Sequence, residues 1–251
     1  MENVGKKSRR IRERVTLAIP VRVSGSDGNN VWSEKSHLMD VTSFGARIRL
    51  SRPTEPGRLL HIVGAIPQSM RSFDYTEGQY RVWSLVRNVK VLDPGADALV
   101  EIGVAFVGKQ PPRSLESNPA RRYEITQSKA ESGLWAVEEE SDQVVIEVEE
   151  TDKRKESRHI IPIDLLIEVF GANGEISQSE NTVTENISRQ GAAVFTTLEV
   201  TPGHFVKISS AQYATSRLAA VRSRRVGPDG VSRLHLEFVG SEWPLESIDP
   251  V

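Results

Sequence analysis

The sequence predicts a mainly all-β protein in which two six-stranded antiparallel β-barrels follow one another. Three observations support this prediction: the chain repeats itself once, its apolar residues recur at every second position, and turn-forming residues separate the resulting segments. A chain of 251 residues with 38% hydrophobic and 26% charged side chains has a globular composition and is long enough for two small domains.

A duplication of a whole domain accounts for the repeat. A shift of about 146 positions, far longer than the roughly 20 to 50 residues of solenoid repeats, places like residues on like. It pairs Val23 with Val169, Gly28 with Gly174, Gly45 with Gly191, Ala46 with Ala192, and Pro56-Gly57 with Pro202-Gly203. We therefore expect one barrel over residues 9–108, an acidic linker over 109–152, and a second barrel over 153–243.

The apolar residues of the first copy alternate with polar ones, as is typical of half-buried strands. Strands are expected at 17–24, 30–40, 45–51, 58–64, 79–92 and 98–108. Gly25 and Gly28 suit a hairpin between the first two strands, and Pro56-Gly57 suits a turn into the fourth. Closing six short strands into a barrel removes their exposed edges. A short helix is expected in the linker, around 120–131.

Charge and composition narrow the possible functions. Lys and Arg number 32 against 34 Asp and Glu, so a net charge of −2 argues against a nucleic-acid polymer as partner, and any attraction for phosphate must be local. Two basic islands, 6–14 and 153–158, meet this need, and an acidic run over 138–152 precedes the second. The absence of cysteine and of a bilayer-spanning apolar stretch predicts a cytoplasmic protein with no membrane span.

Each predicted barrel carries two short motifs in the same order. An Arg-x-x-x-Arg pair comes first, and a polar turn with glycine follows about 30 residues later. The first copy has Arg10 and Arg14, then Asp40, Thr42 and Gly45, whereas the second has Arg154 and Arg158, then Asn186, Ser188 and Gly191. This arrangement resembles the PilZ family, in which RxxxR precedes a six-stranded barrel and [D/N]xSxxG follows its second strand. The resemblance covers 9–108 and 153–243, and it implies that the ligand is cyclic di-GMP.

The residue types suit this ligand, which presents two guanines and two phosphates. A planar guanidinium donates two parallel hydrogen bonds to guanine O6 and N7 or to a phosphate, which lysine does less well. The oxygen of Asn186 or Asp40 can accept from the N–H edge of guanine, and the Ser188 or Thr42 hydroxyl can bond the base or fix the turn. Glycine at 45 and 191 suits a backbone conformation or a close approach that a Cβ would block.

The two copies are unequal, because the first has Thr42 where the pattern has serine and places Glu13 beside Arg14. The added methyl group and the competing carboxylate predict that the first site is the weaker one. The second copy matches the pattern directly at Asn186, Ser188 and Gly191.

The leading hypothesis is a non-enzymatic sensor or effector that binds cyclic di-GMP, reorients its two barrels and acts on an unidentified protein partner. Ligand contacts on both Arg158 and Asn186 would fasten the linker to the second barrel. The alternative is a protein-interaction module in which one or both sites no longer bind ligand, and a third class is a nucleic-acid-binding small barrel. The five histidines stand singly without metal-ligand spacing, and no P-loop or GxSxG motif occurs, so we expect no catalysis, metal or cofactor.

Overall fold

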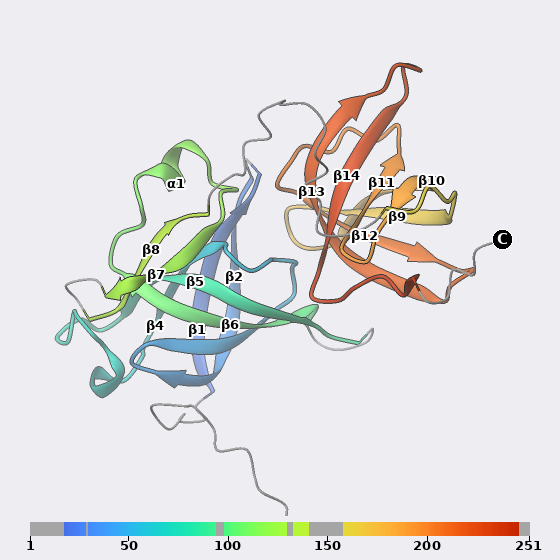
Figure 1. The fold of residues 1–251 in the computed structure, drawn as a ribbon. Helices are drawn as coiled ribbons and strands as arrows, with labels where there is room; N and C mark the ends of the chain where they lie inside the picture. Colours follow the sequence, from blue (N-terminus) through green and yellow to red (C-terminus); the bar gives the residue numbers. More distant parts are fainter. Residues whose placement is uncertain (1–17, 29, 94–97, 130–132, 141–157, 246–251) are drawn as a thin grey trace, which may run out of the picture.

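Two closed antiparallel β-barrels lie side by side in the computed structural model of the chain (Figure 1). The structure describes residues 18–28, 30–93, 98–129, 133–140 and 158–245. The first barrel contains β1 (Ile19–Asp27), β2 (Asn30–Thr42), β3 (Gly45–Leu50), β4 (Leu59–Gly64), β5 (Tyr80–Val91) and β6 (Val100–Gly108). The second contains β9 (Asp164–Phe170), β10 (Ile176–Ile187), β11 (Gly191–Phe195), β12 (Phe205–Ser210), β13 (Thr215–Val226) and β14 (Ser232–Val239). The predicted fold class is confirmed.

The strand order is the same in both barrels. It runs β1-β2-β3-β6-β5-β4 in the first and β9-β10-β11-β14-β13-β12 in the second. Both barrels also have a register shift between their last two strands. It falls at Arg87 where β5 pairs with β6, and at Arg222 where β13 pairs with β14. The duplication therefore extends to the irregularities of the sheets, and an extra residue at such a shift turns its side chain away from the regular alternation.

Alternation of buried and exposed residues explains why these segments are strands. In β3, Ala46, Ile48 and Leu50 are buried in the core, whereas Arg47 and Arg49 lie on the outer face. Because successive side chains of a strand point to opposite faces, this pattern requires one buried and one solvated face.

The expected turns adopt the backbone conformations that glycine permits. Gly28 and Gly174 follow the first strand of each barrel with φ of 55° and 85°, and Gly57 and Gly203 follow proline with φ of 91° and 89°. Gly25, also expected in the first hairpin turn, instead lies within β1, where it pairs with Trp32. The Gly57 N–H donates to the Val86 carbonyl over 2.9 Å, and Gly203 repeats this contact with Val221. A side chain with a Cβ rarely adopts these conformations, so glycine fixes both turns.

The segment between the barrels corrects one expectation. A short helix is present, but it is α1 (Ser114–Ser117), and residues 123–129 of the expected 120–131 helix form strand β7 (Tyr123–Lys129), which pairs with β8 (Trp135–Glu139). Tyr123, Ile125 and Trp135 pack on Leu59, Leu85 and Val107, which face outwards from the first barrel. An outer apolar patch on a barrel favours a covering hairpin, and this long-range contact overrides local propensity.

The two barrels share apolar packing as well as polar contacts. Phe205, Leu218 and Ala220 of the second barrel belong to the same buried cluster as the core residues of the first. The guanidinium of Arg58 lies over the Phe205 ring at 5.6 Å. A separate 3-10 turn, η1 (Gln68–Met70), lies between β4 and β5. Within the described part of the chain, no helix has the length and apolar character needed to cross a membrane.

Candidate ligand site

The second motif forms a tight turn between β10 and β11. The Ser188 backbone N–H donates to the Gly191 carbonyl over 2.8 Å, and the Ser188 hydroxyl donates to the same oxygen over 3.3 Å. Ser188 is buried, so its hydroxyl fixes the turn. A Cβ on Gly191 would lie 2.2 Å from the Leu236 carbonyl oxygen of β14. Glycine is thus required here by the neighbouring strand.

The chain that enters the second barrel runs beside this turn. His159 and Ile187 exchange two backbone hydrogen bonds of 2.8 and 2.9 Å, forming an isolated antiparallel bridge. This bridge holds Arg158 against the end of β10, where its Nη1 donates to Oδ1 of Asn186 over 3.2 Å. Two predicted site residues from different motifs therefore meet, while Arg154 lies outside the described residues.

A row of outward-facing positions extends from Asn186 across the sheet. Asn186 pairs with Ala193, Ala193 pairs with His235, and His235 pairs with Ser223. Ala192 and Val194 face the core, so Ala193 faces outwards, yet it is fully buried. Ala193 is therefore covered by surrounding groups, and in the row it lies between Asn186 and His235.

Positive charge surrounds this row. Burial, then the charges of Arg225 and Arg158, lower the pKa of His235 below its ordinary value, with a smaller opposing effect from Glu185. No role for His235 follows from the sequence, because it stands apart from both motifs and from the other histidines. The signal that could have revealed it is the comparison of IGVAFVG at 102–108 with LHLEFVG at 234–240, in which His235 replaces Gly103.

The first motif forms the same turn but uses its acidic residue internally. The Phe44 N–H donates to the Thr42 hydroxyl over 3.1 Å, and that hydroxyl donates to the Gly45 carbonyl over 3.3 Å. A Cβ on Gly45 would lie 2.2 Å from the Val104 carbonyl oxygen, as at Gly191. Asp40 is 3% exposed and accepts from Nε of Arg47 over 2.8 Å. Arg10, Arg14 and Glu13 lie outside the described residues.

Arg47 is the main difference between the two sites. It pairs with Asp40 in register and also with Glu101 at 3.1 Å, whereas the corresponding position beside Asn186 is Ala193. The first barrel thus supplies its own guanidinium to the motif carboxylate. In the second barrel the guanidinium comes from Arg158, which belongs to the entering chain.

A cavity of about 350 Å³ lies beside the first motif. Thr42, Phe44 and Asn88 line it from the barrel, and Ile125 and Trp135 of the β7–β8 hairpin wall it on the other side. The hairpin therefore partly covers the face of the first barrel that corresponds to the row beside Asn186 in the second.

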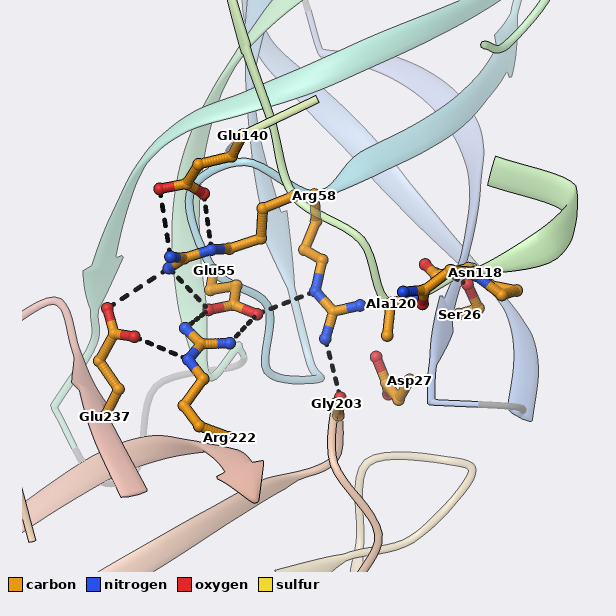
Figure 2. Close-up of polar contacts among 12 residues, drawn as sticks. Ser26, Asp27, Glu55, Arg58, Asn118, Ala120, Glu140, Gly203, Arg222 and Glu237 are labelled. Atoms are coloured by element: carbon orange, nitrogen blue, oxygen red, sulfur yellow. Dashed lines mark hydrogen bonds and ion pairs between the residues drawn. The ribbon is translucent and has the colours of Figure 1, made fainter. Parts of the chain in front are cut away.

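The second motif also adjoins the contact between the barrels. Gly191 pairs with Glu237 of β14, and the Glu237 carboxylate accepts from Nε of Arg222 over 2.7 Å. Arg222 also donates through both η nitrogens to Glu55 of the first barrel, as Figure 2 shows. Arg122, from the segment between the barrels, approaches both Glu55 and Glu237, at 3.8 and 3.3 Å.

Glu55 is the centre of this network and is 1% exposed. Burial alone would raise its pKa, but Arg222, Arg58 and Arg122 together hold the pKa below its ordinary value. A cavity of about 500 Å³ opens beside the network. Arg121, Arg122, Glu140, Arg222 and Glu237 are among its lining residues. Glu139 and Glu140, at the start of the acidic run, pair with Arg121 and Arg122.

No group of three or more His, Asp and Glu side chains in the described part of the chain could hold a metal ion. The outward-facing polar groups at the second motif are the Arg158 guanidinium, the Asn186 amide and the His235 imidazole, and the carboxylates of Glu185 and Glu237 beside them are paired with arginines. A guanidinium, an amide and an imidazole suit recognition of an anion with a hydrogen-bonding edge.

Comparison with solved structures gives several distant matches. The inhibitor of motility MotI/DgrA of Bacillus subtilis matches over 93% of each chain, with 14% identity and a TM-score of 0.31. The Borreliella burgdorferi PlzA protein in complex with c-di-GMP matches over 94% of this chain and 90% of its own, with 10% identity and a TM-score of 0.29. YcgR in complex with c-di-GMP from Escherichia coli matches over 88% and 76%, with 12% identity and a TM-score of 0.30.

No curated protein matches the chain in sequence. A family model does: the PilZ domain model matches residues 152–242, which contain Arg154, Arg158, Asn186, Ser188 and Gly191. The matched range contains every strand of the second barrel, whose strand order the first barrel repeats. The second barrel therefore matches the PilZ domain family over its whole length.

Proposed function

We propose that this protein is a non-enzymatic sensor or effector that binds cyclic di-GMP at the motif of its second barrel. The observation that supports this most directly is the hydrogen bond from Arg158 to Asn186. It joins the RxxxR and [N]xSxxG elements, which stand about 28 residues apart in sequence, at one edge of the barrel. A guanidinium beside an amide oxygen offers both donors for phosphate or guanine O6 and N7 and an acceptor for the guanine N–H edge.

Isothermal titration calorimetry of the full chain with cyclic di-GMP tests the proposal. We expect saturable binding at micromolar ligand that is lost or greatly weakened in Arg158→Ala. The matched control is Arg49→Ala, which removes an exposed arginine from the outer face of the first barrel. Absence of heat at tens of micromolar ligand would overturn the proposal.

We also propose that binding changes the relation between the two barrels. The support is the position of Glu237, which pairs with the motif glycine Gly191 and holds Arg222, the residue that reaches Glu55 of the first barrel. A ligand that draws Arg158 or neighbouring arginines towards its phosphates would change the electrostatic potential at the Glu237 and Arg222 side chains. The size of any shift is limited by the difference in ligand affinity between the two arrangements.

Small-angle scattering with and without saturating ligand tests this second step. A change in radius of gyration or in the distance distribution is expected for the parent. Limited proteolysis at 140–158, whose positions 141–157 lie outside the described residues, provides an independent measurement. Unchanged scattering together with unchanged cleavage would overturn the proposed reorientation but not the proposed ligand binding.

A protein-interaction role is favoured specifically for the first barrel. Its motif carboxylate is already paired with Arg47, and the cavity beside Thr42 is partly covered by the β7–β8 hairpin. The first barrel would then serve as the surface that reports ligand binding to a protein partner. Pull-down with ligand-loaded and ligand-free protein, compared with the Arg158→Ala variant, would show whether partner capture depends on the second site.

A further inference from the structure

His235 occupies a position that the motifs do not predict. It lies on β14, opposite Ala193 on one side and Ser223 on the other, in the same outward-facing row as Asn186. The two barrels differ here, because the first barrel has Gly103 at the equivalent point beside Arg47. Where the first barrel pairs Arg47 with Gly103, the second barrel pairs Ala193 with His235.

Charged groups from four segments act on the imidazole. Arg158 comes from the entering chain, Glu185 from β10, Arg225 from β13 and Arg233 from β14, while β11 contributes only uncharged residues. Glu185 is held by Arg233 through a hydrogen bond from Nε, so its charge is already compensated. Among the described residues, His235 has no hydrogen-bond partner although it is only partly exposed. A half-buried ring in this state has both nitrogens available.

We propose that His235 is a ligand-contacting residue of the second site and that cyclic di-GMP binding is coupled to proton uptake by its imidazole. This inference rests on the proposed function. A phosphodiester placed between Arg158 and the imidazole would add a negative charge to surroundings in which three arginines face the single carboxylate of Glu185. The neutral ring of the free protein would become an imidazolium that donates to the phosphate or to guanine O6.

The direction of the resulting pH dependence follows from the charges. The free protein disfavours the imidazolium because of burial and the facing arginines, whereas the bound anion favours it. Binding therefore takes up a proton, and affinity rises as the pH falls. Phosphodiesters remain ionised over this range, so the ligand itself does not contribute a titration. One linked proton changes affinity by at most about tenfold per pH unit.

The experiment is a calorimetric titration of the full chain with cyclic di-GMP at pH 8.0, 7.0 and 6.0. For the parent we expect about a five- to tenfold gain in affinity from pH 8.0 to 6.0. His235→Gln should bind more weakly at pH 6.0 and lose this pH dependence, and His235→Gly, which installs the residue of the first barrel, should do the same. His37→Gln, an exposed histidine of β2, is the control and should keep the parental profile.

A second measurement follows the ring directly. The His235 imidazole resonance, assigned by its loss in His235→Gln, should titrate at higher pH with ligand than without, which also covers the case of a poorly folded variant. If the parent does not bind cyclic di-GMP, the proposed function fails and this inference with it. If the parent binds but the His235 variants keep its affinity and pH profile, or the resonance does not shift, only the role of His235 is overturned.

Discussion

Glu55 of the first barrel accepts hydrogen bonds from both η nitrogens of Arg222 of the second barrel (Figure 2). Arg58 adds a third contact at 2.9 Å from Nε and donates from Nη2 to the Gly203 carbonyl of the second barrel over 2.8 Å. Since Glu55 is fully buried, its charge depends on these arginines. Removing the Glu55 charge would leave the buried arginine charges around it uncompensated. Such a loss destabilises a protein by more than the intact ion pair stabilises it.

Glu55→Gln should therefore destabilise the protein by about 3 kcal/mol, measured as the free energy of unfolding in urea. The loss should be accompanied by a changed scattering profile, because the contacts of Arg222 with Glu55 across the two barrels would be weakened. Lys109→Ala, which removes an exposed ion pair with Asp74, is the control and should cost less than about 1 kcal/mol. Equal small losses in both variants would show that the network does not stabilise the interface.

Asp27 should make the stability of the protein depend on pH. It accepts from Nε1 of Trp32 over 3.1 Å and lies 3.7 Å from Nη1 of Arg52. Burial raises its pKa from 3.8 to about 6 despite the opposing charge of Arg58. A folded-state pKa above the unfolded one means that the folded state holds the proton more tightly. The contribution of Asp27 is therefore greatest below about pH 4, decreases as the pH rises towards 6, and is constant above that.

The effect of Asp27→Asn on the free energy of unfolding should consequently be more favourable at pH 7.5 than at pH 4.5, by roughly 2 kcal/mol. The measurement is the difference in Tm or unfolding free energy between variant and parent at the two pH values. Asp164→Asn, at an exposed position of β9, should show the same difference at both. A difference for Asp27→Asn that does not change with pH would contradict the raised pKa.

Arg158→Ala should reduce the affinity for cyclic di-GMP by about 30-fold or more, because a charge-assisted contact of this kind contributes roughly 2–5 kcal/mol. The same range is expected for Arg154→Ala.

Asn186→Ala should weaken binding and reduce the preference for guanine, since the Asn186 oxygen would accept from the guanine N–H edge. Calorimetry with cyclic di-AMP as the competing ligand checks this second point, and equal binding of both ligands by the parent would contradict guanine readout.

Gly191→Ala and Gly45→Ala should destabilise their barrels, because each added Cβ would meet a carbonyl oxygen of the neighbouring strand at 2.2 Å. Backbone cannot move aside as a flexible side chain can, so we expect a loss of about 1–3 kcal/mol in thermal or urea unfolding. Gly78→Ala is the matched control, since nothing lies within 4 Å of its added Cβ. Unchanged stability of Gly191→Ala would show that β14 can shift away from the turn.

The first site should bind cyclic di-GMP at least tenfold more weakly than the second. In the full chain carrying Arg158→Ala and Asn186→Ala, any residual calorimetric binding reports the first barrel. Arg47→Ala in that background should then change the residual affinity, because it releases Asp40 from its internal partner. Residual binding as tight as that of the parent would reverse the ranking of the two sites.

Most of the fold could be predicted from the sequence because apolar and polar residues alternate along strands that have one buried and one solvated face. The expected strand at 45–51 corresponds to Gly45–Leu50 and the one at 79–92 to Tyr80–Val91. The linker was less predictable. Within 123–129 only Tyr123 and Ile125 are apolar, which is too short a pattern to identify a strand. The segment becomes a strand because β8 pairs with it and because the outer apolar residues Leu59, Leu85 and Val107 pack against it.

The sequence by itself determined the duplicated barrels, the order of the two motifs and the identity of the motif residues, because these depend on local spacing and turn chemistry. The tertiary structure alone decided how each motif is used. Asp40 is paired because β3 places Arg47 opposite it, whereas Asn186 meets Ala193 and is reached by Arg158. The Glu55–Arg222 contact joins residues 167 positions apart. Strand register and barrel packing set such distances, and neither is written in the spacing of any single motif.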